Sequence, residues 1–409
     1  MTVEEIRHHP NPLAPHYSAF RVSERVLLTG HSHQAWPDRA REGLLRSWHD
    51  AADRVDGKWE RAFAEADRVR AGYARLLDDE PGNVALSAST HDLVVRWLSA
   101  LPLRERPRVV TTDGEFHAIR RQLERLEEEG LEVVRVPVTP VDSLVDRAAD
   151  ALDDRTAAAM ISSVLFENAR IVPGLDRLAA ACRRQGVPLL VDAYHHLNVV
   201  PFSVREMGLE DAYVTGGGYK YCQLGEGNAF LRFPPGTDLR PVVTGWFAEF
   251  GTVVLGEGEA KLRSDHVLEA DAPRVVYGAG PARFAGATYD PTSHYRGAEA
   301  FRFFHDQALE PAFLREVSRH QVGLLARTFD DLDLDPDVIT RDRFQPLEET
   351  AGFLALRSPQ AGRLERMLRE RGIWTDHRNE ILRLGPAPYL SDGQILEGVE
   401  ALGEAVGQL

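Results

Sequence analysis

The chain has 409 residues, which is too long for one small core and fits two domains, one large and one small. Hydrophobic residues make up 43% of it and charged residues 27%, the composition of an ordinary soluble protein. The formal net charge of −15 argues against binding to a nucleic acid backbone and leaves no basic face for an anionic membrane. We therefore expect neither partner.

Cysteine content and the N-terminus point to one compartment. Cys182 and Cys222 give no disulfide framework and no CxxC metal site. The opening MTVEEIRHHPNPLAPH has no apolar core of signal-peptide length, and no later run approaches a membrane span. These features are typical of a cytoplasmic enzyme, and we expect that localisation.

The first ordered segment expected after a polar arm is a short strand within Arg25–Trp36, RVLLTGHSHQAW. Its HSH triplet suggests a metal site, but His31 and His33 at i and i+2 of an extended chain point to opposite sides. With no carboxylate or cysteine set nearby, we expect no metal. From Asp38 to Leu77 apolar residues recur at helical spacing, which predicts two helices.

A strand from Val84 to Ser87 leads into small hydroxyl residues and a helix that starts near Thr90. Small polar residues at a helix N-terminus leave backbone N–H groups free at the positive end of the dipole, which suits a phosphate. The same pattern also serves as an N-cap with no ligand. Ser89 and Thr90 are candidates for a phosphate site because they follow a strand.

Further strands are expected to alternate with helices, at residues 108–112, 133–138 and 157–164. This alternation predicts a parallel, doubly wound α/β sheet. After the first of them, Phe116 or His117 could stack on a cofactor ring or plug the top of the next helix. After the third, the turn FENARIVPGL places Asn168 and Arg170 at the carboxyl edge of the sheet.

The stretch from Val187 to Phe230 holds two apolar, strand-like runs with polar ends. Asp192 ends the first run at the carboxyl edge, where open α/β sheets bind ligands. The second run ends in three glycines, Tyr219 and Lys220, and the glycines permit a sharp bend beside a planar ligand. Asp192 and Lys220 could be a surface ion pair. They could also be a pyridoxal phosphate site, in which lysine forms a Schiff base and aspartate keeps the pyridine nitrogen protonated.

Beyond Phe230 the pattern changes. Residues 251–280 are rich in glycine and charge, so we expect a long loop there, followed by a helical stretch from about Ala298. A small α+β domain closes the chain, with a helix near 361–371, strands at 373–376 and 381–384, and a final helix at 391–406. We divide the chain into an N-terminal arm contributing to the small domain (1–45), a large cofactor-binding domain (46–280) and a small C-terminal domain (281–409).

Seven motifs occur in one order along the chain: LLTGHSHQAWPD, SASTHDL, VDAYHHLNVVPFSV, GGGYKYCQLGEGNAFL, GWF, RFAGATYDP and RLGPAPYL. Together they resemble the kynureninase-like branch of the class V aminotransferase group, within the fold type I pyridoxal phosphate enzymes. The resemblance implies a mainly parallel, seven-stranded doubly wound sheet in the large domain. It also implies pyridoxal 5′-phosphate as the cofactor, and a homodimer whose active site is shared between subunits.

The resemblance assigns roles to matching positions. Lys220 carries the Schiff base and then shuttles the Cα proton, Asp192 pairs with the pyridine nitrogen, and Tyr219 adds a phenol beside the lysine. The other implied cofactor contacts are Ser89 and Thr90 at the phosphate, Phe116 (or, less fittingly, His117) on the ring, His195 near Asp192 or the ring oxygen, and Trp246 and Thr288 at the neighbouring subunit's phosphate. Arg383 would be the fork for the substrate carboxylate.

The reaction implied by the resemblance is hydrolytic Cβ–Cγ cleavage of L-kynurenine or a related 2-amino-4-oxo acid to alanine and an acid. The chain departs from the kynureninase pattern near the substrate: GHSHQ, with His31 and Ser32, replaces GNSLG; Asn168 to Arg170 replaces a threonine-glycine turn; and ATYDP replaces GTPP. Such departures favour a relative that acts on something else.

Three alternatives stay open. A desulfurase or C–S lyase shares the fold, but desulfurases need a mobile cysteine in the small domain, and here Cys222 follows the lysine and is interpreted as a packed residue. An aminotransferase, β-eliminating or condensing biosynthetic enzyme of the group is the second. A degenerate binding protein is the third, and it predicts loss of the lysine or the aspartate.

Overall fold

The computed structural model describes residues 1–252 and 275–409. Within them the largest sheet has seven strands in the order β2-β8-β7-β6-β5-β3-β4. The strands are β2 Val84–Ser87, β3 Arg108–Thr112, β4 Glu132–Val136, β5 Thr156–Ser162, β6 Leu189–Asp192, β7 Tyr213–Gly217 and β8 Ala229–Arg232. Only β8 runs against its neighbours β7 and β2, so the expected mainly parallel α/β sheet is confirmed.

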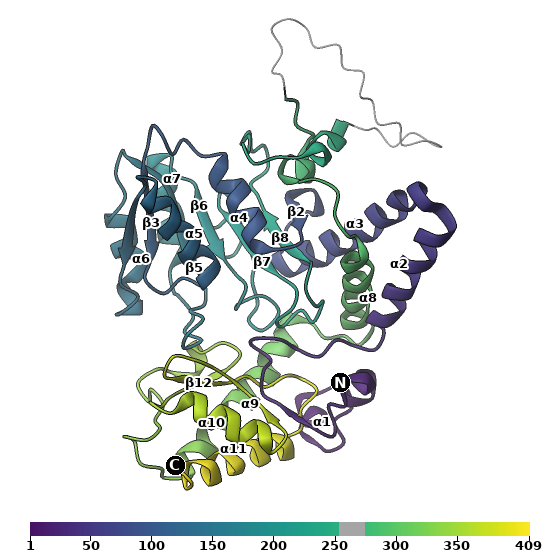
Figure 1. The fold of residues 1–409 in the computed structure, drawn as a ribbon. Coiled ribbons are helices and arrows are strands. Elements are labelled where there is room, and N and C mark those ends of the chain that lie inside the picture. The colour runs from purple at the N-terminus through teal and green to yellow at the C-terminus, as the bar shows by residue number, and fades with distance from the viewer. Residues whose placement is uncertain (253–274) are drawn as a thin grey trace, which may run out of the picture.

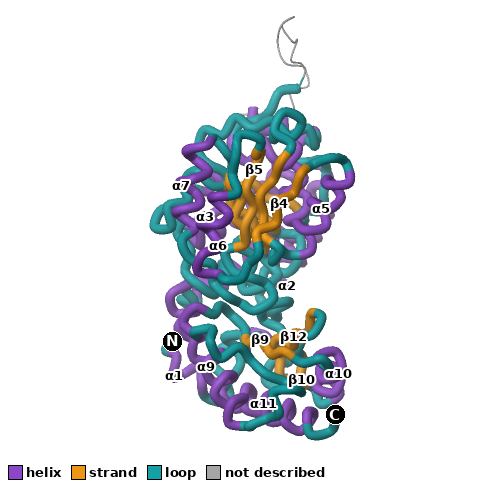
Figure 2. Tube along the Cα trace, turned by 90° about the vertical axis from the view of Figure 1, so that its left-hand side faces the viewer, coloured by secondary structure: helices purple, strands orange, loops and turns teal. Residues whose placement is uncertain are grey.

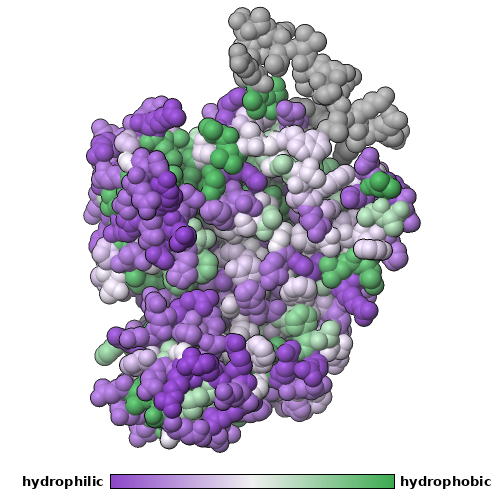
Figure 3. Space-filling model, in the orientation of Figure 1, coloured by the Kyte–Doolittle hydropathy of each residue, from purple (hydrophilic) through white to green (hydrophobic). Residues whose placement is uncertain are grey.

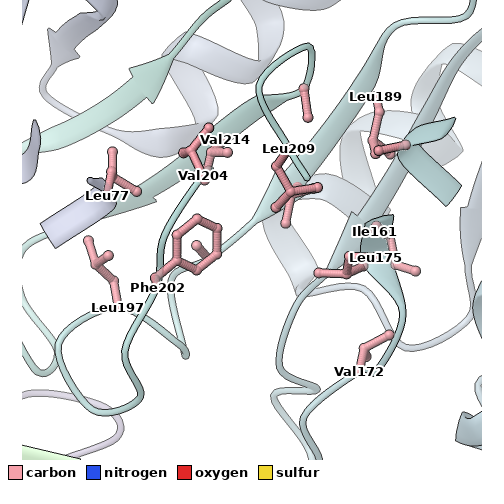
Figure 4. Close-up of a cluster of buried hydrophobic side chains, with 14 of the residues drawn as sticks. Leu77, Ile161, Val172, Leu175, Leu189, Leu197, Phe202, Val204, Leu209 and Val214 are labelled. Atoms are coloured by element: carbon pink, nitrogen blue, oxygen red, sulfur yellow. The ribbon is translucent and has the colours of Figure 1, made fainter. Parts of the chain in front are cut away.

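Helices cover both faces of this sheet, as the two views show (Figures 1 and 2). One face carries α4 Thr90–Ser99 and α5 His117–Glu128, and the other carries α3 Lys58–Leu77, α6 Leu144–Asp150 and α7 Leu175–Gln185. Every residue of β5 and β6 is buried, which is why these strands read as unbroken apolar runs. Figure 4 shows the packing on the second face, where Leu175 of α7 lies beside Ile161.

A helical layer flanks the β2 end of the sheet. It is built from α2 Ala40–Arg54, α3 and α8 Thr292–Asp306. Helices α2 and α8 meet closely, because a Cβ added to Gly43 would lie 2.3 Å from the carbonyl oxygen of Tyr295. Ala298, Ala300 and Phe301 of α8 belong to the large-sheet core. Phe303 and Phe304 near the end of the same helix lie in the core of the small domain, so α8 packs against both bodies.

The lower body in Figure 1 holds the N-terminal arm and the chain from α9 to the C-terminus. Strands β1 Val26–Leu27 and β10 Ile373–Trp374 pair in parallel, and β11 Asp376–Arg378, β12 Ile381–Leu384 and β9 Leu354–Arg357 form an antiparallel sheet. Its helices are α1 Val3–Arg7, α9 Pro311–Asp331, α10 Ala361–Glu370 and α11 Asp392–Val406. Ile6, Leu13 and Tyr17 of the arm lie in the same core.

A separate apolar cluster joins the two bodies. Val164 and Tyr221 from the large body pack with Ala351 and Phe353 from the small one, and the amide of Ala351 donates to the carbonyl of Ala169 over 2.8 Å. Short 3₁₀ turns connect the main elements at Ala14–Phe20, Val55–Gly57, Pro81–Asn83, Val141–Ser143, Trp246–Thr252, Gly280–Phe284 and Leu347–Glu349.

The part of the chain that follows residue 291 begins with two helices, α8 and α9. The 21 residues of α9 form a separate helix that the pattern analysis did not distinguish from the stretch beginning near Ala298. The long loop expected at 251–280 falls largely outside the described residues. None of the described helices combines the length and the apolarity needed to cross a bilayer.

Candidate active site

A pocket of about 360 Å³ opens at the carboxyl ends of the parallel strands. It is lined by the sequence-predicted residues Ser89, Thr90, Phe116, Asp192, His195, Tyr219 and Lys220. These come from the β2–α4 turn, the β3–α5 turn, the end of β6 and the segment after β7. Fold topology therefore gathers side chains that are more than 130 residues apart in the sequence, as expected for the carboxyl edge of a parallel sheet.

Lys220 is 6% exposed and lies among aromatic rings. Its Nζ is 5.0 Å from the ring centre of Tyr219, 5.2 Å from that of Tyr194 and 5.5 Å from that of Phe116. Burial lowers the pKa of Lys220 to about 7, and the positive charge of Arg383 acts in the same direction. A substantial fraction of this amine is therefore neutral near neutral pH, the form that can act as a nucleophile or accept a proton.

Asp192 is the last residue of β6, and the neighbouring strand β7 pairs with it in parallel through Thr215. Its carboxylate is 8% exposed and accepts a hydrogen bond from the backbone N–H of Tyr194 at 2.8 Å. Burial raises the pKa of Asp192 to about 6. A carboxylate held this way at a strand end can accept a strong hydrogen bond from a protonated ring nitrogen.

His195 lines the same pocket with both ring nitrogens buried and without a hydrogen-bond partner among the described residues. Burial lowers its pKa well below the usual value, so the imidazole is neutral. Buried polar atoms are nearly always paired in folded proteins. An unpaired donor and acceptor in a pocket therefore indicate that a polar ligand completes the site.

Helix α4 presents its N-terminus to the pocket. Ser89 is the N-cap, with an extended backbone and a side chain that accepts from the N–H of Asp92 at 3.1 Å. The hydroxyl of Thr90 lies 3.4 Å from the carbonyl oxygen of Gly216. Because the first amides of a helix have no partner within it, the amides of Thr90 and His91 remain available to an anion. The N-cap interpretation is thus correct for Ser89 and is compatible with a phosphate.

The space beside the glycines before Tyr219 is filled by protein side chains and not left for a planar ligand. Gly216 and Gly217 belong to β7, and none of the three glycines has a positive φ. A Cβ on Gly217 would lie 2.4 Å from the hydroxyl of Tyr194, and one on Gly216 would lie 2.8 Å from the Phe230 ring. Gly216 and Gly217 make room for side chains of the protein itself, and the expected bend begins at Gly218, after the end of β7.

Arg383 and His31, both predicted at the substrate, meet at a residue that the sequence interpretation missed. Asp376 accepts from Nε of Arg383 at 2.9 Å, from its Nη2, and from Nε2 of His31 at 2.7 Å. Burial lowers the pKa of His31 to about 4, so the neutral ring donates through Nε2 and leaves the buried Nδ1 without a partner. Arg383 also donates to the carbonyl of Phe166, which lines the pocket.

Several predicted residues lie away from the pocket wall. Arg170 pairs with Asp142 and Glu349, and the side chain of Asn168 accepts from the backbone of Arg170. Ser32 contacts His33, and His117 packs against Phe166 and contacts Arg120. Trp246 donates to Thr288 at 3.1 Å on an exposed surface. Their roles in substrate or cofactor binding stay predictions.

Glu115 is a second residue that the sequence interpretation missed. This buried carboxylate accepts from the hydroxyls of Thr112 and Ser162, each at 2.6 Å, and from the amide of Ser162. Burial raises its pKa to about 7. Ser162 lines the pocket and pairs with Asp192 across the sheet. The sequence signal that could have identified Glu115 is its position as an acidic residue in the turn after the buried strand β3.

Taken together, an amine on Lys220, a strand-end carboxylate, unpaired His195 nitrogens and a helix N-terminus fit the parts of pyridoxal phosphate. Comparison with known proteins agrees, because the family model described as aminotransferase class V matches residues 60–243. Those residues are therefore similar to the class V aminotransferase family.

Three curated relatives illustrate the range of proteins to which this chain is similar. An uncharacterized aminotransferase, YcbU of Bacillus subtilis, is 25% identical over 207 residues, covering 50% of this chain and 54% of the relative. Cysteine desulfurase IscS of Rickettsia akari is 24% identical, covering 53% and 55%. Isopenicillin N epimerase of Streptomyces clavuligerus is 26% identical, covering 49% and 52%. The chain spans about half the length of the curated relatives it matches.

Solved structures match over nearly the whole chain. A C-DES mutant with glycine covalently linked to its PLP cofactor superposes with a TM-score of 0.80 at 15% identity, covering 96% of this chain and all of that one. The cysteine desulfurase CsdA of Escherichia coli gives 0.77 at 16% identity, covering 98% and 99%. At such identities the likeness establishes the fold type I architecture of both bodies.

Proposed function

We propose that the protein is a pyridoxal phosphate-dependent enzyme that acts on an amino acid. The observation that carries this proposal is the meeting of Lys220 and Asp192 from adjacent strand ends in one pocket, beside the unpaired nitrogens of His195. The cofactor is pyridoxal 5′-phosphate. A degenerate binding protein would have no use for a buried lysine whose pKa lies near 7.

Each part of the pocket has a matching task. Lys220 is the attachment point for the cofactor aldehyde, Asp192 holds the pyridine nitrogen, and Phe116 covers a ring face. Ser89, Thr90 and the first amides of α4 bind the phosphate. When bound, pyridoxal phosphate supplies an electron sink for negative charge at Cα of an amino acid.

Lys220 also supplies the acid–base chemistry. With a pKa near 7, its amine can accept a proton from a substrate carbon at neutral pH and return it to another atom. Asp192 would hold a protonated ring nitrogen of the cofactor, because that proton and the carboxylate would stabilise each other. The surrounding rings of Tyr194, Tyr219 and Phe116 exclude water from the amine.

The reaction supported best is the alternative of a class V lyase or aminotransferase, since the relatives named above are an aminotransferase, a desulfurase and an epimerase. The buried cysteines narrow this choice. Cys182 and Cys222 are each 1% exposed, and burial raises the pKa of both thiols. Neither can serve as a mobile thiolate, so we propose chemistry without a persulfide on the protein.

We also propose a homodimer. Leu45, Trp48 and Val55 of the α2 region are 51%, 75% and 69% exposed, and Figure 3 shows apolar surface on the side where α2 lies. Apolar groups gathered on one side favour a protein partner. The exposed Trp246 and Thr288 pair would then serve the neighbouring subunit, as the family resemblance implies.

The test exploits the small number of lysines, which are Lys58, Lys220 and Lys261. Purified protein should absorb visible light when loaded with cofactor, and borohydride reduction followed by peptide mapping should place the label on Lys220. Lys220→Ala should lose the visible band, whereas Lys58→Ala, the matched control, should keep it. A label on another lysine would overturn the assignment.

Product analysis then separates the reactions. The loaded protein is incubated with L-cysteine, L-cystine, common amino donors with a 2-oxo acid, L-kynurenine and 3-hydroxykynurenine. Pyruvate or sulfide, or a new amino acid from the 2-oxo acid, would support the lyase or aminotransferase proposal. Anthranilate with alanine would instead establish the kynureninase-like reaction.

A further inference from the structure

One carboxylate in the pocket wall has no task in holding the cofactor. Besides Asp192, the wall includes Glu226, which lies in the segment between Lys220 and β8. In the proposed function Asp192 holds the ring nitrogen and Lys220 holds the cofactor aldehyde, so both of these groups are used. The negative charge of Glu226 is left over, and a substrate that enters the pocket would meet it.

A chain of contacts places the carboxylate of Glu226 on the Tyr219 side of the pocket. Its Oε1 lies 3.6 Å from Nε2 of His33. The His33 ring stacks on the Tyr219 ring, with the ring centres 4.8 Å apart and the planes 14° from parallel. The Tyr219 ring centre in turn lies 5.0 Å from Nζ of Lys220. Two stacked rings therefore connect this carboxylate to the reactive amine.

The negative charge of Glu226 is not cancelled within the described part of the chain. Its side chain is 59% exposed, and His33 is its one ion-pair partner among the described residues. Burial lowers the pKa of His33, although the nearby carboxylate acts in the opposite direction, so this ring is neutral at neutral pH. Arg296 donates to the backbone carbonyls of Leu224 and Glu226. A cation on a ligand would thus find an uncompensated carboxylate.

Glu226 and the expected anchor of the substrate lie on opposite sides of the pocket. Arg383, the fork that the family resemblance implies for the substrate α-carboxylate, donates to the carbonyl of Phe166, which follows β5. Glu226 precedes β8. Strands β6 and β7 lie between β5 and β8, so three strand spacings of about 4.8 Å, or roughly 14 Å, separate these strands. An amino acid held at Arg383 would have its side chain free to extend across the pocket toward Glu226.

Building on the proposed function, we propose that Glu226 selects amino acid substrates whose side chain ends in a positive charge. The aromatic rings of Phe116, Tyr194 and Tyr219 line the pocket. Such rings pack against a methylene stem and attract a cation at its end. A side chain that ends in a carboxylate would be repelled by Glu226 at the same place. The substrate class is therefore a basic amino acid, such as ornithine or lysine, and not an acidic one.

The experiment isolates the charge at the end of the side chain. In three stable probes the α-nitrogen of L-ornithine, L-norleucine or L-2-aminoadipic acid carries a 5′-phosphopyridoxyl group. The three side chains share one methylene stem and end in a cation, a methyl group and an anion. Kd values are measured by calorimetry with the full-length protein freed of cofactor, for wild type, Glu226→Gln and Glu167→Gln. Glu167 is the matched control, an exposed glutamate that follows the pocket residue Phe166 but does not line the pocket.

Wild type should bind the ornithine probe more tightly than the aminoadipate probe. Loss of a partly exposed charge should weaken the first and strengthen the second by about threefold each, so Glu226→Gln should lower the ratio of the two Kd values about tenfold. The norleucine probe should change by less than about twofold, and Glu167→Gln should keep the whole ratio. Because Arg296 holds this segment through backbone carbonyls, Glu226→Gln should keep the fold.

Survival of the ratio in Glu226→Gln would overturn the proposal, as would an equal loss in Glu167→Gln. It would also be overturned by a wild type that binds the aminoadipate probe at least as tightly as the ornithine probe. Failure of the proposed function looks different, because neither the probes nor pyridoxal phosphate itself would then bind.

Discussion

The two ends of the site differ in how their buried polar groups are satisfied. On the large sheet, the amine of Lys220 and the imidazole of His195 are almost fully buried, and the imidazole has no partner among the described residues. On the small sheet, Asp376 and Arg383 form a hydrogen-bonded network with His31, which comes from the segment after β1 and whose Nδ1 alone in this network has no partner among the described residues. Since unpaired buried groups are costly, the first end is built to receive a ligand, and the second is built to hold its shape.

Among the substitutions that test this difference between the two ends of the site, Asp376→Ala should have the largest effect. The substitution leaves the buried guanidinium of Arg383 without a counterion, so we expect the free energy of unfolding to fall by about 3–5 kcal/mol. Denaturant titration measures it. Glu380→Ala is the control, because within residues 1–252 and 275–409 the side chain of Glu380 pairs with the exposed Arg357 alone, and its loss should cost at most about 0.5 kcal/mol. Equal losses in the two variants would show that the network does not support the fold.

The ligand-receiving end should reveal itself through pH. Burial lowers the pKa of Lys220 to about 7, and only the neutral amine attacks an aldehyde. The rate of cofactor capture by the cofactor-free protein should therefore rise about tenfold per pH unit below 7 and level off above it. Stopped-flow absorbance measures this rate. A solution lysine peptide, with a pKa of about 10.4, should show no plateau near neutrality. A capture rate that climbs steadily to pH 10 would contradict the shifted pKa.

Tyr17→Phe should produce the smallest effect. Its buried hydroxyl donates to Gln223 at 2.5 Å, and Gln223 donates to Gln34 at 2.6 Å, which ties the N-terminal arm to the segment after the lysine. Loss of one buried hydrogen bond should cost about 1 kcal/mol of unfolding free energy. Cofactor affinity should stay within about threefold, a change below 1 kcal/mol. A larger loss of affinity, measured by absorbance titration, would mean that the support is part of the cofactor site.

Local sequence was enough to place the ligand-receiving end. Asp192 and Lys220 each follow an apolar run, and the carboxyl ends of parallel strands must meet, so their proximity follows from the sheet alone. The parallel, doubly wound arrangement of the sheet was also accessible, because alternating strands and helices have few arrangements. Its seven strands were expected only from the family resemblance.

The sequence did not predict the network around Asp376, because that network depends on the register in which β11 pairs with β12. The sequence around Arg383 does not indicate that Asp376 is its cross-strand neighbour. It also does not indicate that His31, more than 340 residues away, donates to the same carboxylate. The same holds for the glycines before Tyr219. Their small size was evident, but which ring would occupy the space depended on tertiary packing.

Tyr194 packs over Gly217 and thereby links Gly217 to Asp192. The phenol occupies the volume that any side chain at position 217 would need, and the amide of that same tyrosine anchors Asp192. Enlarging Gly217 by a single methyl would thus displace the acid's anchor while leaving every charged group in the sequence unchanged. A substitution at Gly217, which carries no functional group, would therefore change how Asp192 polarises the ring of the proposed cofactor.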